Sequence, residues 1–191
     1  MKPDDFFNTV RAAIHVNFHR TAHNGLLTHH EQHDADTASE FSIRPSCKMV
    51  AFSLDVRGAN PFPVFNAGVP GLTAKNDLTI ICENKGKVYV FVIEYKNSAT
   101  PGNAQHQIEC GMAFAEYLFK LLRYCQGLKI EPHIFGVAAY RPKDVAKGRT
   151  NPQIRFSKQG LHGILRAEWI IDDALPLPLS ELVRAAESSL Q

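Results

Sequence analysis

Little in this sequence separates it from an ordinary globular chain. Its 191 residues carry a formal charge of only +2, so it lacks the strongly basic character of many nucleic-acid-binding domains. This balance does not exclude a nucleic-acid enzyme, because only the surface that follows the backbone must be positive. No apolar run approaches transmembrane length, and there are no internal repeats or linkers. With 45% hydrophobic residues, the chain is predicted to form a single domain over residues 1–191.

Cysteines are few, and none is placed for a CxxC pair. The four cysteines are Cys47, Cys82, Cys110 and Cys125. We interpret them as free thiols in a reducing compartment rather than as a disulfide framework. The first ten residues carry acids early and lack the apolar core of a signal peptide. The sequence therefore predicts a cytoplasmic protein.

Two neighbouring apolar runs predict the centre of a β-sheet. Residues 78–83 and 87–96 are joined by the polar turn 84–86, which is the pattern of an antiparallel hairpin. The second run is apolar on both faces, as expected for a strand in the middle of a sheet covered by helices. An earlier run, 47–56, predicts a third strand. The intervening segment 57–76 holds three prolines and three glycines, and loops of this length are often functional.

Helical patterns flank these strands. A helix over 3–27 is predicted because Phe7, Val10, Ile14 and Phe18 fall on one helical face. The other expected elements are a polar loop, a helix, a strand and a C-terminal helix, at residues 28–40, 103–125, 129–142 and 179–190. This order predicts an α/β fold with a central mixed sheet flanked by helices.

Three polar side chains are expected at one end of the hairpin. Residues i and i+2 of a strand share a face, so Glu94 and Lys96 should project side by side. Asp77 begins the partner strand, and antiparallel pairing brings it to the same end. Two converging carboxylates suit a hard cation such as Mg²⁺ or Mn²⁺, which activates water and polarises a phosphoryl oxygen. A neighbouring lysine can position the water or offset charge on the phosphate.

These residues carry a resemblance to a known superfamily. Asp77, sixteen further residues and then Glu94-Tyr95-Lys96, followed by a helix and a strand, resemble the PD-(D/E)xK phosphodiesterases. That superfamily includes restriction endonucleases, Holliday-junction resolvases and repair nucleases, and its restriction-endonuclease-like core is similar to residues 46–140. The resemblance implies a Mg²⁺-dependent nuclease acting on DNA, in defence, restriction or repair. It also implies that Asp77, Glu94 and the Tyr95 carbonyl bind the metal and that Lys96 is the catalytic lysine.

The chain departs from the superfamily pattern in places. Asn76 stands where a proline commonly precedes the first acid, and Gln107 is followed four residues later by Gly111 rather than by the tyrosine of the RecB-like branch. Many members add an acid from the first helix. Here the candidates are Glu31 and Glu40, and Glu40 is preferred because it directly precedes the strand region.

A second copy of the short motif provides an internal comparison. Glu83-Asn84-Lys85 also spells ExK, but it lies in the predicted hairpin turn, where charged side chains are simply solvated. Only Glu94 and Lys96 end a central strand beside an acid of the partner strand. We therefore predict that the turn copy has no functional role.

Six polar side chains are candidates for contacts with nucleic acid. They flank the long loop, begin the helix after the hairpin or lie in a basic loop, and they are Arg57, Lys75, Gln105, Gln107, Arg141 and Lys143. A polar first helical turn and an ordinary solvated loop are equally good interpretations of the glutamines and of the basic loop. A homodimer also stays open, because short nucleases often cut both strands as dimers.

Two other functions stay open as well. The same fold could serve as a nucleic-acid-binding or adaptor protein without turnover. Alternatively, His15, His19 and His23 recur every four residues on the predicted first helix, and His29, His30 and His33 follow. Such spacing can gather imidazoles for zinc or nickel, although a solvated polar face is the simpler interpretation.

Overall fold

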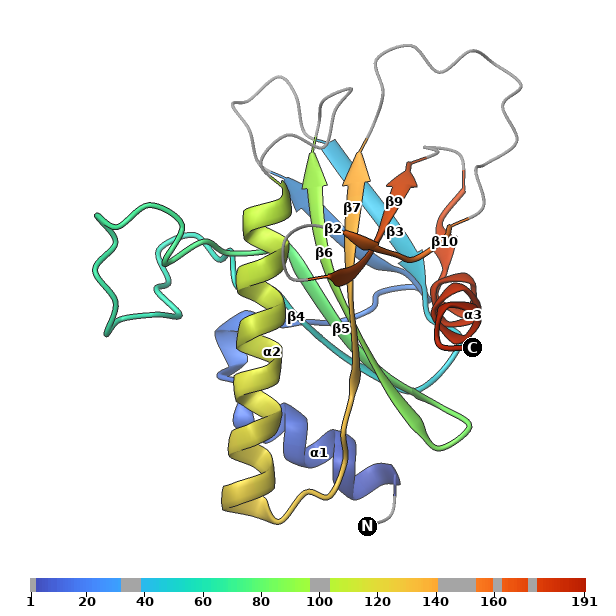
Figure 1. Cartoon of the computed structure of the whole chain (residues 1–191), viewed down its shortest axis with the longest axis horizontal. Coiled ribbons are helices and arrows are strands. Elements are labelled where there is room, and N and C mark those ends of the chain that lie inside the picture. Colours follow the sequence, from blue (N-terminus) through green and yellow to red (C-terminus); the bar gives the residue numbers. More distant parts are fainter. Residues whose placement is uncertain (1–2, 32–38, 97–103, 141–153, 160–162, 172–174) are drawn as a thin grey trace.

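The computed structural model describes residues 3–31, 39–96, 104–140, 154–159, 163–171 and 175–191. Within these residues, the chain folds into two β-sheets and three α-helices (Figure 1). The helices are α1 (Pro3–Ala13), α2 (Ala104–Gln126) and α3 (Leu179–Ser189). The strands are β1 (His19–Arg20), β2 (Leu27–Glu31), β3 (Ser39–Arg44), β4 (Met49–Phe52), β5 (Leu78–Asn84), β6 (Lys87–Lys96), β7 (His133–Tyr140), β8 (Ser157–Gln159), β9 (Ile164–Ile170) and β10 (Leu177–Pro178). None of the described helices has both the length and the apolar character needed to cross a membrane.

The larger sheet is mixed, which confirms the predicted α/β class. Its strand order is β1-β4-β5-β6-β7-β9-β8. Strands β4, β5 and β6 pair antiparallel, whereas β6, β7 and β9 run parallel. The predicted sequence of helix, three strands, helix and strand corresponds to α1, β4 to β6, α2 and β7.

Strand β6 lies at the centre of this sheet with both faces buried. Val90 and Val92 join the core cluster that also contains apolar residues of α1 and α2. On the other face, Phe91 and Ile93 pack in a cluster with residues of β3 and α3. The two-sided apolar pattern of β6 therefore arises because helices α1 and α2 cover one face and the small sheet β10-β3-β2 with α3 covers the other.

Helix α1 is shorter than the predicted 3–27 and ends at Ala13. Beyond it, the His15 side chain accepts the N–H of Asn17, and residues 16–18 form a single 3₁₀ turn. His19 and Arg20 then pair antiparallel with β4. The free edge of β4 offers backbone partners to this segment, and edge pairing outweighs the apolar periodicity that favoured a longer helix.

The loop predicted over 28–40 is wrong at both ends, because residues 28–31 belong to β2 and residues 39–40 to β3, whereas 32–38 lie outside the described residues. Strands β2 and β3 form an antiparallel pair in which His29 lies opposite Phe41. Leu27, His29, Phe41 and Ile43 alternate inward and are buried, while Thr28, His30, Glu40 and Ser42 between them are more exposed. Polarity alone pointed to a loop here, although the alternation is typical of a half-buried strand.

Gly111 determines how closely α2 approaches the sheet. A Cβ atom at this position would lie 2.5 Å from Oδ1 of Asn76 and 2.6 Å from Cγ1 of Val92. Any side chain would therefore force α2 away from the end of the β5–β6 hairpin. The close approach brings Gln107, one helical turn earlier, to the end of β6.

Candidate active site

Asp77 and Glu94 lie opposite each other at the open end of the β5–β6 hairpin. The register pairs Leu78 with Ile93, so the residues that precede and follow this pair also face each other. The backbone N–H of Asp77 donates to Glu94 Oε2 at 3.3 Å, and the N–H of Tyr95 donates to Asp77 Oδ2 at 2.7 Å. Each carboxylate is thus held by the backbone of the opposite strand. Both are buried, with Glu94 1% and Asp77 6% exposed.

Lys96 is held beside these carboxylates from two directions. Its Nζ donates to Glu94 Oε1 at 2.6 Å and to Gln107 Oε1 at 2.7 Å. Gln107 is fixed in turn, because its Nε2 donates to the backbone carbonyl of Lys75 at 3.0 Å. The ammonium group therefore has one defined position at the end of β6, with about a quarter of the side chain open to solvent.

The electrostatics of the pair disfavour two ionised carboxylates. Burial, followed by the nearby charge of Asp77, raises the pKa of Glu94 to about 8, even though Lys96 and the Asp77 amide favour its ionised form. In the metal-free protein at neutral pH, Glu94 thus retains a proton most of the time. A cation bound between the carboxylates would favour the ionised form of Glu94, because its charge offsets the repulsion from Asp77 and compensates part of the cost of burial.

The structure adds His29 of β2 to this site. Its Nε2 lies 3.7 Å from Asp77 Oδ1, and the side chain is 8% exposed. Burial, with further contributions from Arg20 and His30, lowers the pKa of His29 to about 4, so the imidazole facing Asp77 is neutral at neutral pH. The sequence signal that could have found it is the inward alternation of Leu27 and His29 in what was predicted to be a loop.

Glu40, the preferred additional acid, points away from this centre. It neighbours the buried Phe41 and faces the opposite side of β3, where its carboxylate lies 3.0 Å from Nδ1 of His30 and its side chain is 61% exposed. Glu31 ends β2, and its side chain lies outside the described residues. Among the described side chains of β2 and β3, His29 rather than Glu40 therefore lies next to Asp77.

The Tyr95 carbonyl is oriented toward the site. In an extended strand the N–H and C=O of one residue leave on the same side. Since the N–H of Tyr95 donates to Asp77, the carbonyl also faces the Asp77 edge. The Tyr95 ring lies on the opposite face of β6 from Glu94 and Lys96. It is fully buried near Phe41, with ring centroids 5.5 Å apart.

The other predicted contacts are divided between the site and its surroundings. Lys75 donates from Nζ to the carbonyl of Ala59 and lies 3.8 Å from Asp55, so its charge stays at the base of the long loop. Gln105 accepts a hydrogen bond from Arg166 of β9 and links α2 to the sheet. Arg57 is exposed in the long loop. Arg141 and Lys143 lie outside the described residues.

The second ExK copy lies at the turn end of the hairpin, where Glu83 and Asn84 end β5 and Lys85 begins the turn, which is 85–86 rather than the predicted 84–86. Lys85 and Gly86 have positive φ angles, and Glu83 accepts the N–H of Gly86 at 2.7 Å. The Lys85 ammonium lies 3.7 Å from Glu187 of α3. These contacts belong to the turn and are at the opposite end of the hairpin from Asp77.

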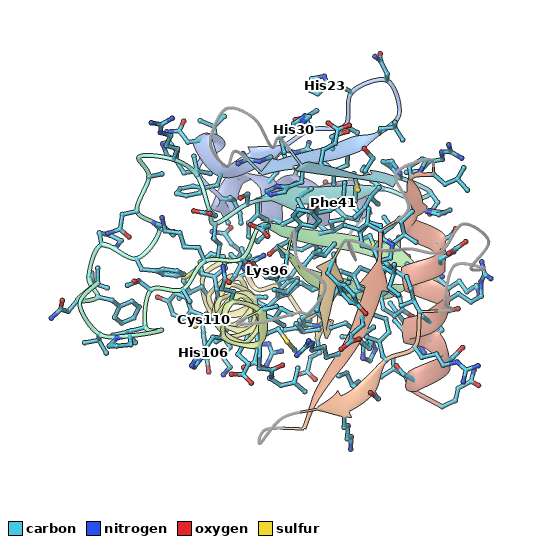
Figure 2. The ribbon with its side chains drawn as sticks, turned by 90° about the horizontal axis from the view of Figure 1, so that it is seen from above. His23, His30, Phe41, Lys96, His106 and Cys110 are labelled. Atoms are coloured by element: carbon cyan, nitrogen blue, oxygen red, sulfur yellow. The ribbon has the colours of Figure 1, made fainter. Side chains whose placement is uncertain are left out.

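The histidines are dispersed rather than gathered. His15 precedes the 3₁₀ turn, His19 lies in β1, and His23 makes a turn with Leu26, so the four-residue spacing does not fall on a helix. In Figure 2, His23 and His30 lie beyond Phe41, whereas His106 lies on α2 on the other side of Lys96. Across the described residues, no group of three or more His, Cys, Asp or Glu side chains is arranged to hold a metal. The predicted zinc or nickel site relied on His15, His19 and His23 sharing one helical face, and that prediction is wrong.

The donor set at the hairpin end suits an oxygen-preferring cation. It consists of the two carboxylates and the Tyr95 carbonyl, and Mg²⁺ is usually bound by one or two carboxylates and several waters. Burial first and the charge of Asp77 second raise the pKa of Glu94, and a cation between the two carboxylates would oppose both effects. Comparison of the chain with models of protein families, with curated proteins and with solved structures gave no significant match.

Proposed function

We propose that this protein is a metal-dependent nuclease, with DNA as the expected substrate, built on a core similar to that of the PD-(D/E)xK superfamily. The observation that carries the proposal is the convergence of Asp77, Glu94 and Lys96 at the buried end of β6. A structural ion pair between Lys96 and Glu94 would not require a second buried carboxylate opposite it. Buried charges of the same sign lower stability, so their placement here points to a ligand.

Each residue has a role in this proposal. Asp77, Glu94 and the Tyr95 carbonyl would hold Mg²⁺ or Mn²⁺, and the neutral imidazole of His29 lies beside them. When bound, the cation polarises a phosphoryl oxygen and lowers the pKa of a coordinated water. Lys96 offsets negative charge that develops on the phosphate, and Gln107 keeps its ammonium in place.

The location of the residues within the sheet supports the same proposal. Strands β6, β7 and β9 are parallel, so their carboxyl ends share one edge of the sheet. Glu94 and Lys96 lie at the carboxyl end of β6, and α2 begins nearby, since Gln107 contacts Lys96. In α/β sheets, ligands commonly bind outside the carboxyl ends of the parallel strands.

The direct test is hydrolysis of defined substrates. Linear, circular, single-stranded and branched DNA, and RNA, are incubated with the protein in Mg²⁺, in Mn²⁺ and in EDTA. We expect cleavage that requires the metal and that falls by at least about 10²-fold in each of two variants. Asp77→Asn removes a proposed metal ligand, and Lys96→Met removes the charge that offsets the negative phosphate. Binding without cleavage in either metal would instead support the nucleic-acid-binding or adaptor alternative.

The chain offers its own control for this experiment. The double variant Glu83→Ala, Lys85→Ala removes the same motif from the turn, where the contacts are with Gly86 and Glu187. We expect its cleavage rate to match the wild type. If the turn variant lost activity while Asp77→Asn retained it, the assignment of the active site to the end of β6 would be wrong.

A further inference from the structure

The segment between β4 and β5, residues 57–76, forms an arm that projects from the body of the molecule beside α2 (Figure 1). The arm is built from successive tight turns. Two of them are closed by hydrogen bonds from Phe65 N–H to the Phe62 carbonyl, 3.1 Å, and from Val69 N–H to the Asn66 carbonyl, 3.1 Å. Its base is tied by Lys75 Nζ to the carbonyl of Ala59. It is therefore an ordered element with its own internal contacts.

The arm exposes apolar side chains to an unusual degree. Val64 is 84%, Phe65 47%, and Val69 and Leu72 each 45% exposed. Soluble proteins rarely gather exposed apolar side chains in one segment unless the segment makes contacts with a partner.

A row of aromatic rings connects the arm to the core. Phe52 of β4 packs edge to face with Phe114 of α2, with centroids 6.0 Å apart. Phe114 packs in the same way with Phe62 of the arm, 6.0 Å, and Phe62 lies 6.2 Å from Phe65. The row begins fully buried at Phe52 and ends half-exposed at Phe65. Phe65 is therefore a half-exposed ring that is supported by its contact with Phe62.

The charge of the arm and its position favour one kind of occupant. Residues 57–76 contain Arg57 and Lys75 but no aspartate or glutamate. The arm also leads directly into the candidate active site, since the Lys75 carbonyl holds Gln107 and Asp77 follows two residues later. Because Lys75 pairs with Asp55 at the base, Arg57 is the exposed cation of the arm. An acid-free segment that presents an exposed cation and a supported aromatic ring has the features that bind single-stranded nucleic acid, where bases stack on aromatic side chains.

We propose that Phe65 is a stacking platform for an unpaired base of the nucleic acid that the protein binds. The proposal rests on the proposed function, because it takes nucleic acid as the ligand of the same site. It adds that the protein prefers single-stranded or partly unpaired substrates over fully paired duplex. Phe62 and Phe114 keep the Phe65 ring oriented, and Arg57 adds positive charge for the backbone.

The test measures binding without hydrolysis. Full-length protein carrying Asp77→Asn is titrated in EDTA against a fluorescent single-stranded deoxyoligonucleotide containing 2-aminopurine, and against the matched duplex. We expect tighter binding to the single strand, with quenching of 2-aminopurine by stacking. Adding Phe65→Ala should weaken binding by about 5- to 150-fold for each stacked base and remove the quenching.

Three further variants separate stacking from other effects. Phe65→Trp should retain binding and quenching, whereas Phe65→Leu keeps an apolar side chain without the aromatic face and should behave like the alanine variant. Tyr124→Ala is the matched control, because Tyr124 is an exposed aromatic side chain that lies near the C-terminal end of α2 rather than in the arm. It should bind as the parent does. Unchanged melting temperatures establish that the Phe65 variants are folded.

The outcomes for the arm and for the nuclease are distinguishable. If Phe65→Ala binds and quenches as its parent does, or if no variant binds the oligonucleotide, the arm proposal is overturned even when the wild type cleaves duplex DNA. If Phe65→Ala loses binding while the wild type cleaves nothing, the arm proposal stands and the proposed nuclease fails. If Phe65→Ala instead dissociates a dimer in sedimentation and leaves oligonucleotide binding unchanged, the occupant is a second copy and the proposal is overturned.

Discussion

Replacing Asp77 with asparagine should stabilise the metal-free protein in alkaline solution while it abolishes cleavage. Asparagine fits the site, because its Oδ1 can accept the Tyr95 N–H and its Nδ2 can face the neutral His29 ring. The substitution removes one of two facing negative charges. Its effect on stability therefore depends on whether Glu94 is ionised.

The sign and size follow from the pKa of Glu94. An acid whose pKa is raised from 4.5 to about 8 on folding makes the protein progressively less stable as the pH rises through that window. The full shift corresponds to a loss of roughly 5 kcal/mol as an upper bound. Burial is the larger cause and Asp77 the second, so relief of the Asp77 charge should recover about 1–2 kcal/mol.

The assay is thermal unfolding in EDTA at pH 5.5 and pH 9. For a chain of this length, 1–2 kcal/mol corresponds to roughly 2–8 °C in Tm. Asp77→Asn should exceed the wild type by that amount at pH 9 and match it closely at pH 5.5, where Glu94 is protonated in both proteins. Asp55→Asn is the control, because that carboxylate is 58% exposed and far less affected by burial. An Asp77→Asn protein that is no more stable than the wild type at pH 9 would refute this view of the site.

Two further predictions concern the metal and the lysine. Binding of Mg²⁺ should release a proton from Glu94 near pH 7, and the release should decrease as the pH rises through the raised pKa of this group. Titration calorimetry in buffers of different ionisation enthalpy measures the release, and Glu94→Gln should abolish it. No release at pH 7 would mean that the ion binds elsewhere or that Glu94 is already ionised. Gln107→Leu should lower the cleavage rate about tenfold, because the Lys96 ammonium loses its second hydrogen-bond partner. The Mg²⁺ affinity should stay unchanged, since Gln107 contacts neither carboxylate in the described structure. An equal loss of metal affinity would show that Gln107 acts on the acids instead.

The parts of the fold that the sequence predicts well are those whose signals are local. The β5–β6 hairpin has a largely apolar pattern on both strands and a turn that contains Gly86 in a positive-φ conformation. Helix α2 has a long apolar stripe. The relation between Asp77 and Glu94 follows from the hairpin alone, because antiparallel pairing leaves little freedom once the turn is placed.

The parts that escape prediction depend on contacts between distant segments. His29 reaches Asp77 only because β2 pairs with β3 in the register that places His29 opposite Phe41, and because Phe41 packs over Tyr95. Neither relation is encoded within a short window of sequence. The end of α1 is similar, since its position is determined by the free edge of β4 rather than by residues 14–27 themselves.

The backbone contacts of the two acids sharpen the question of why acids are there. The Asp77 N–H donates to Glu94, and the Tyr95 N–H donates to Asp77, so the carboxylates satisfy backbone donors at the point where the β5–β6 ladder ends. Asparagine and glutamine have carbonyl oxygens that could accept the same two bonds without repelling each other. Structure alone would therefore favour amides at both positions. The use of two acids with Lys96 beside them fits the proposed function, in which a cation binds between the carboxylates and favours their ionised forms.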